Sequence, residues 1–232
     1  MRYGSAAEPR VANGLRFDRR LLRDRADIFE GEVRVTPGGH NGVLRVLSFL
    51  HHTDSGTYAE AIRLAEQNHA TPDVSATHRP GTLKYGFGIN VEQELTKSVG
   101  VFGRLGWNDG KTESFAFTEV EEVATLGGQL AGTHWHRPDD RLGLALVSEA
   151  LSAGHRDYLA AGGAGFLLGD GRLSYGREQI LETYYRLQYV WPQQPGPVRW
   201  QVGPDFQYIR NPGYNRDRGP ARFWALRLHL EY

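Results

Sequence analysis

Apolar and polar side chains alternate at every second position in three segments of this chain. The segments are residues 83–95, 182–191 and 224–232. In the last one, the apolar positions are Trp224, Leu226, Leu228, Leu230 and Tyr232, and polar side chains fill most of the positions between them. Side chains of a β-strand point alternately to two faces. The pattern therefore predicts strands with one apolar and one polar face.

Weaker alternation extends this prediction to about ten strands. Further strands are expected near residues 11–17, 29–35, 43–50, 99–107, 115–130, 142–147 and 198–208. Pro204 interrupts the last of these, and the alternation slips between Phe117 and Ala124, so a β-bulge is expected at both places. Only residues 57–67 have the composition of a helix, which Asp54 or Ser55 could cap.

The predicted connections are sorted by length between the two ends of the strands. Joins near residues 52–80, 108–111, 148–176 and 211–220 fall at one end, and joins near 37–41, 96–98, 136–141 and 192–197 fall at the other. The second set is uniformly short, whereas the first contains the long joins. At 108–111, the Asp-Gly pair favours a tight hairpin. Bacterial outer-membrane barrels combine short periplasmic turns with longer external loops. The sequence thus predicts an all-β fold, an antiparallel up-and-down transmembrane β-barrel.

Composition changes this picture in three ways. The formal net charge is zero, which argues against a nucleic-acid-binding surface. Cysteine is absent, so disulfides and thiolate metal sites are excluded. The first residues contain no apolar stretch of the kind found in a secretory signal peptide. Because an outer-membrane protein needs such a signal, we expect this sequence to begin inside a longer protein.

The polar face of the predicted strands carries both signs of charge. The side chains expected to line a lumen are Lys84, Glu92, Glu94, Arg104, Glu182, Arg186, Arg199, Asp205 and Arg227. Arginine donors and carboxylate acceptors can replace water around a hydroxyl-rich, neutral solute, and weak sequential contacts permit passage. No cofactor is expected.

Catalytic and metal-binding alternatives are weaker. Ser152, His155 and Asp157 are the residue types of a hydrolase triad, but they lie in one predicted loop without a nucleophile elbow. His134 and His136, with Asp139 and Asp140 nearby, could hold a metal, although placement at a membrane interface is favoured. An acid/base pair among Glu92, Glu94 and Glu182 is disfavoured relative to lumen lining. An outer-membrane enzyme acting on lipid and a soluble β-sandwich that binds carbohydrate remain the alternative functions.

Four longer strings carry a family resemblance. They are residues 137–145 (RPDDRLGLA), 155–166, 168–175 and 204–220. Together they resemble the carbohydrate-selective porins of OprB type, clearly over residues 81–232 and loosely before that. The resemblance implies that residues 1–232 are the C-terminal part of one barrel domain of about sixteen strands. It also implies a bacterial outer-membrane location and diffusion of sugars.

The last strand ends in an aromatic residue and resembles the signal for outer-membrane barrel insertion. The expected partners are therefore carbohydrate solutes, outer-membrane lipid and the barrel-assembly machinery, without nucleic acid. A homo-oligomer is left open.

Overall fold

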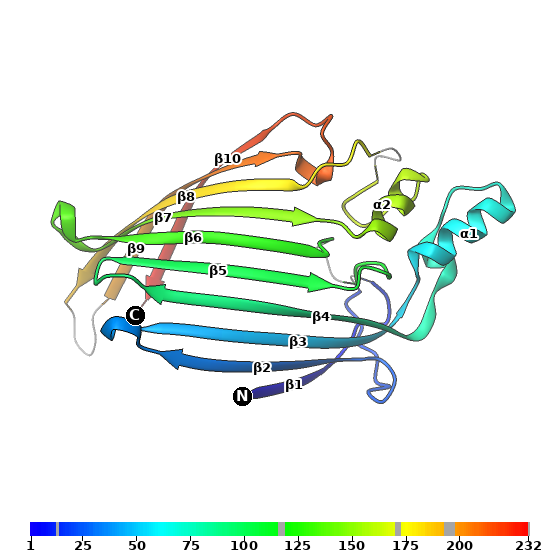
Figure 1. Cartoon of the computed structure of the whole chain (residues 1–232), viewed down its shortest axis with the longest axis horizontal. Coiled ribbons are helices and arrows are strands. Elements are labelled where there is room, and N and C mark those ends of the chain that lie inside the picture. Colours follow the sequence, from blue (N-terminus) through cyan, green and yellow to red (C-terminus); the bar gives the residue numbers. More distant parts are fainter. Residues whose placement is uncertain (13, 116–118, 170–172, 193–197, 232) are drawn as a thin grey trace.

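Ten antiparallel strands form a single sheet in the computed structural model, which describes all residues except 13, 116–118, 170–172, 193–197 and 232. Each strand pairs with its neighbours in the sequence, in the order β1 to β10 (Figure 1). The strands are β1 Arg2–Ala7, β2 Arg25–Val35, β3 Gly42–Ser55, β4 Arg79–Glu94, β5 Val99–Asn108, β6 Glu122–Gly132, β7 Arg137–Ala150, β8 Glu178–Trp191, β9 Val198–Arg210 and β10 Ala221–Glu231. This order confirms the expected up-and-down topology.

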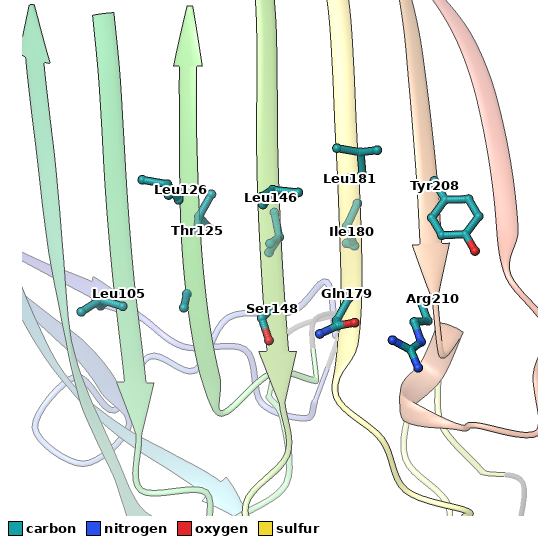
Figure 2. A pocket seen from close by; sticks show the side chains of 12 residues that line it. Leu105, Thr125, Leu126, Leu146, Ser148, Gln179, Ile180, Leu181, Tyr208 and Arg210 are labelled. Atoms are coloured by element: carbon teal, nitrogen blue, oxygen red, sulfur yellow. The ribbon is translucent and has the colours of Figure 1, made fainter. Parts of the chain in front are cut away.

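One face of the sheet is a band of exposed aliphatic side chains. Leu126 pairs with Leu146, and Leu146 with Leu181, so these leucines form a row across β6, β7 and β8 (Figure 2). Leu126 is 65% exposed and Leu228, on β10, is 72% exposed. An apolar surface of this extent, which the described residues leave uncovered, is the expected lipid-facing side of a barrel wall.

The connections separate by length as the sequence predicted. Residues 8–24, 56–78, 109–121, 151–177 and 211–220 connect strands at one end, and residues 36–41, 95–98, 133–136 and 192–197 connect them at the other. Helices α1 (Tyr58–Asn68) and α2 (Ala153–Ala160) lie at the end with the long connections (Figure 1). That end is called the loop end below. No helix in the described part of the chain is both long and apolar enough to cross a bilayer.

The first strand lies elsewhere than the sequence predicted. Residues 11–17 belong to the connection between β1 and β2, where Phe17 makes only an isolated bridge with Pro9. The strand is instead β1, whose sequence RYGSAA contains a single large apolar residue. Its pairing with β2 stabilises it, for example through Tyr3 opposite Phe29. Such a strand has no alternation strong enough to detect.

Three local expectations were wrong. Residues 108–111 form no tight hairpin, because the chain continues from Asn108 to an antiparallel bridge between Thr112 and Thr57 before β6 begins. Pro204 produces no bulge, since the register between β9 and β10 is continuous through its pairing with Leu226. The helix at 57–67 is confirmed as α1, but its N-cap is Thr57 rather than Asp54 or Ser55. The bulge expected from Phe117 falls outside the described residues.

The turn between β6 and β7 is fastened by a buried carboxylate. Asp140 is fully buried and accepts hydrogen bonds from Arg137 Nε at 2.6 Å and from the Gln188 backbone N–H at 3.0 Å. The Tyr185 hydroxyl also donates to it, and Trp135 Nε1 donates to that hydroxyl at 2.9 Å. These contacts give a structural reason for the RPDD string. They also leave Asp140 unavailable as a metal ligand.

We expect Asp140→Asn to destabilise this turn by about 1–2 kcal/mol, because the amide weakens the charge-assisted bond from Arg137. The measurement is the denaturant midpoint of the protein in lipid vesicles. Asp139→Asn is the matched control, since Asp139 is the exposed neighbour of Asp140 near the start of β7. Equal midpoints for the two variants would contradict this role of Asp140.

Candidate functional site

The nine charged residues expected to line a lumen all lie on the face opposite the aliphatic band. The pairing register establishes this placement, with Arg104 opposite Asn90 and Thr125, and Arg227 opposite Gly203. Asp205 likewise lies opposite Ala225 rather than opposite a leucine of the apolar face. This surface is called the polar face below. That these side chains line a channel stays a prediction.

Three of the nine meet in one cluster on β8, β9 and β10. Arg227 lies 2.8 Å from Glu182 and 2.7 Å from Asp205. Gln207 Nε2 donates to Glu182 at 3.1 Å, and Asp205 is only 3% exposed. One guanidinium thus compensates two carboxylates, which holds the cluster together without leaving a free positive charge there.

Arg186 is adjacent to this cluster and lines a hollow in the polar face. The hollow measures 370 Å³ and is lined by Tyr184, Arg186, Gln201, Gly203, Arg227 and His229. The Nε of Arg186 is buried, and it has no hydrogen-bond partner among the described residues. Burying a donor without a partner is unfavourable. Because Nε itself is enclosed, the part of the Arg186 guanidinium that lines the hollow is the group suited to a water or a solute hydroxyl.

A second hollow lies toward the short-turn end of the polar face. It measures 430 Å³, and its lining includes Glu92, Glu94, Phe102, Arg104 and Gln129. The guanidinium carbon of Arg104 lies 5.1 Å from the ring centroid of Phe102, within cation–π range. The aromatic ring, guanidinium and carboxylates on this face offer stacking and hydrogen-bonding groups to a polar ring.

The remaining predicted residues are distributed along the face and engaged locally. Lys84 donates to the backbone oxygens of Thr112 and Glu113 at the loop end. Glu94 accepts from the Asn41 N–H at 3.1 Å. Arg199 pairs with Glu231 at 3.0 Å. These three side chains do not join the Arg227 cluster.

Glu92 is bound by Arg45, which was not among the polar-face residues predicted from the sequence. Arg45 lies 2.7 Å from Glu92 and 2.8 Å from Glu32, and so bridges β2, β3 and β4. Its position between Leu44 and Val46 on a predicted strand was a usable signal. Glu92 and Glu182 lie on β4 and β8, with three strands between them. They therefore cannot act as an acid/base pair.

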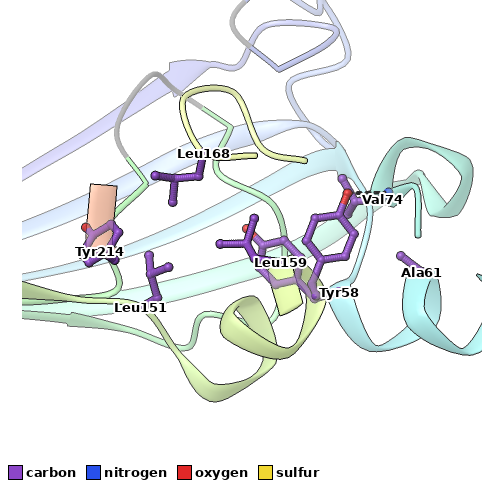
Figure 3. Packing of buried hydrophobic residues seen from close by; sticks show 8 residues of the cluster. Tyr58, Ala61, Val74, Leu151, Leu159, Leu168 and Tyr214 are labelled. Carbon is purple, nitrogen blue, oxygen red and sulfur yellow. Dashed lines mark hydrogen bonds between the residues drawn. The ribbon is translucent and has the colours of Figure 1, made fainter. Parts of the chain in front are cut away.

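The loops at the loop end share one hydrophobic core. Its buried members come from α1, the segment after it, α2 and the connections before β8 and β10 (Figure 3). They are Tyr58, Ala61, Val74, Leu151, Tyr158, Leu159, Leu168 and Tyr214. This set is called the loop core below. The connections 56–78, 151–177 and 211–220 are consequently packed against each other at the loop end of the sheet.

Two buried carboxylates, Glu119 and Glu121, hold the loops around the loop core. Glu119 accepts three backbone N–H groups, from Phe166 at 3.1 Å, Leu167 at 2.9 Å and Leu168 at 3.0 Å. The Tyr214 hydroxyl donates to the backbone oxygen of Glu119 at 2.7 Å. Burial raises the pKa of Tyr214 above its usual range, so this hydroxyl remains a neutral donor.

His155 is fully buried beside the second carboxylate, Glu121. Its Nδ1 lies 3.1 Å from Glu121 Oε1, and its ring stacks on Tyr58 at 4.3 Å between centroids. Ser152 instead caps α2: its hydroxyl accepts from the His155 N–H at 3.1 Å and donates to Gly110 O at 2.6 Å. The Ser152, His155 and Asp157 trio thus has structural bonds and does not form a nucleophile–base pair.

Among the described residues, no group of three or more histidine, cysteine, aspartate and glutamate side chains is arranged to hold a metal ion.

Comparison with known proteins gives one family and one related fold. Residues 14–232 match the family model described as carbohydrate-selective porin, OprB family. The high-pH structure of Pseudomonas putida OprB superposes with a TM-score of 0.69 at 16% sequence identity. That superposition covers 93% of this chain and 50% of the other, so this chain spans about half the length of the protein it matches. No curated protein matches the sequence.

Proposed function

This chain belongs to the OprB family of carbohydrate-selective porins, and we propose that it forms part of the wall of a bacterial outer-membrane channel through which carbohydrates diffuse. The observation that carries this proposal is the contrast between the two faces of one sheet. The exposed aliphatic band suits lipid, whereas the opposite face holds charged clusters and hollows. Membership of a porin family favours a channel over an enzyme.

The polar face supports neutral, hydroxyl-rich solutes better than ions of one sign. Arg227 is compensated by Glu182 and Asp205, and Arg45 by Glu32 and Glu92. Paired charges leave donors and acceptors on the wall without a large field of one sign. A sugar hydroxyl can exchange water for such groups at little net cost, so binding is weak enough for passage.

Arg186 is the side chain that we propose to contact the passing sugar most directly. Arg186→Ala in the assembled channel should leave folding nearly intact and weaken sugar-induced block of the current by roughly fivefold, the loss of about 1 kcal/mol typical of one hydrogen bond. Single-channel recording in planar bilayers with maltose or glucose measures both conductance and block.

Arg199→Ala is the matched control for this experiment. Arg199 lies on the same face of the adjacent strand, but its guanidinium is engaged with Glu231. A much smaller change in sugar block is expected. If Arg186→Ala abolished folding, or left both conductance and sugar block unchanged, Arg186 would be structural and the proposed solute contact would fail.

We also propose that the barrel-assembly machinery recognises β10. Trp224, Leu226, Leu228 and Leu230 project from one face of this strand and are all exposed. Tyr232 lies outside the described residues. Deleting Tyr232 should remove most outer-membrane insertion, because an amphipathic aromatic is favoured at the membrane interface. Tyr232→Phe should retain insertion. Quantifying the protein in membrane fractions distinguishes the two variants, and full insertion without Tyr232 would exclude this role.

A further inference from the structure

A groove crosses the aliphatic band near the loop end of the sheet. It measures 590 Å³ and is lined by three consecutive residues from each of β6, β7 and β8, together with residues of β5 and β9 (Figure 2). Ala124 and Ser148 pair with each other and provide small side chains there. Leu105, Leu126 and Leu146 stand exposed around them. Small residues between leucines create an elongated apolar depression.

Two arginines lie on the same side of the sheet where this groove reaches β9: Arg210 lines the groove, and Arg222 lies beside it on β10. Arg210 is paired across the strands with Gln179, and Arg222 with Tyr208; Gln179, Tyr208 and Arg210 all line the groove. Within the described part of the chain, neither Arg210 nor Arg222 forms an ion pair or a side-chain hydrogen bond. Arg177, by contrast, is bonded to Glu122 at 2.9 Å and to Ser148 at 3.0 Å. Two positive charges thus remain uncompensated at this end.

We propose that the groove and its two arginines bind one anionic, phosphate-bearing lipid of the leaflet on the loop side. Ala124, Ser148, Gln179 and Arg210 form one row of cross-strand partners. The phosphate lies between Arg210 and Arg222, and an acyl chain lies along this row over Ser148 and Ala124. The charge complementarity selects an anionic headgroup, and guanidinium groups suit phosphate oxygens. This inference rests on the membrane orientation in the proposed function, but it does not depend on what the channel passes.

A second copy of the chain fits this surface poorly. Two copies in one membrane share their orientation, so a twofold contact across the groove would place both pairs of arginines at the same depth. Like charges would then face each other across the interface, which disfavours it. A lipid phosphate brings the opposite charge to the same position.

The test compares two lipids that have identical chains and different headgroups. The assembled channel in mild detergent is titrated with dioleoylphosphatidylglycerol or dioleoylphosphatidylcholine, and bound lipids are counted by native mass spectrometry. We expect one phosphatidylglycerol to bind more tightly than phosphatidylcholine, with roughly fivefold lost for each arginine replaced, the factor equivalent to about 1 kcal/mol per charge. Arg210→Gln and Arg222→Gln together should remove the preference.

Groove shape is tested separately from charge. Ala124→Leu fills the depression and should weaken the binding of both lipids, whereas Ser48→Leu adds the same bulk to the aliphatic face of β3, away from the groove, and should change neither. Equal binding of the two lipids to the unaltered channel would overturn the headgroup assignment. An unchanged affinity of the Ala124→Leu channel for the two lipids would mean that they bind as annular lipid around the barrel and not in the groove. A dimer that excludes lipid from the groove would also overturn the proposal. Conductance and sugar block report independently on the proposed function.

Discussion

Glu119→Ala should unfold the long connection between β7 and β8 while leaving the sheet intact. The substitution removes the carboxylate to which the backbone N–H groups of Phe166, Leu167 and Leu168 all donate. Leu168 is buried, and a buried donor without a partner costs about 1–3 kcal/mol, whereas Phe166 and Leu167 are exposed and their amides can bond to water. The substitution also removes the acceptor that holds these three residues together. Amide exchange at residues 166–168 should accelerate by about two orders of magnitude or more.

Glu122→Gln is the matched control for this prediction. Glu122 begins β6 close to Glu119 in sequence, but its partner is the exposed Arg177. Its loss should leave exchange at residues 166–168 unchanged, because surface ion pairs contribute little. If Glu119→Ala left the exchange of these amides as slow as in the parent chain, the loop would be held by its apolar contacts alone.

The 232-residue chain alone should form no stable pore in a planar bilayer. The sheet runs from β1 to β10 without pairing between those two strands in the described residues. Both outer strands therefore present backbone groups that lipid cannot satisfy. About sixteen strands are typical of a porin-sized channel, and we propose that further strands pair with these two edges in the assembled channel.

Two measurements check this expectation. Planar-bilayer recording should show no steady conductance from the isolated chain, and amides of β1 and β10 should exchange faster than those of β5 and β6. The chain has no cysteine, so Ser5→Cys with Leu228→Cys gives a single disulfide only if the two edges meet. A steady pore that forms this disulfide would show that ten strands close by themselves.

The strands with strong alternation could be predicted because the order of apolar and polar residues within each strand is enough to identify it. Between Leu83 and Glu94 on β4 and between Trp224 and Glu231 on β10, the large apolar and the charged positions separate by parity alone, and the register keeps that separation across neighbouring strands. Membership of the polar face therefore follows from sequence for residues such as Arg104 and Arg227. The period of a strand is two, so one correctly phased residue fixes all the others.

The loop core could not be predicted because its contacts join distant positions. Tyr214 and Glu119 are 95 residues apart, and His155 and Glu121 are 34 apart. No periodicity relates such positions, and single loop residues such as Leu168 resemble ordinary surface apolar residues in the sequence. The sequence likewise does not show which residue pairs with each buried charge. For that reason, Ser152, His155 and Asp157 could be considered a triad.

The shared core has a consequence for how channels of this kind can diverge. A mouth built from independent loops could accept insertions one loop at a time. Here α1, α2 and the connection before β10 bury side chains against one another. Exchanging any one of these loops for that of a relative exposes the apolar surface of the others, so viable chimeras must transplant the loops as a set. Substitutions at Tyr58, Leu159 and Tyr214 should accordingly occur together among related channels. The short turns at the opposite end can vary independently of one another.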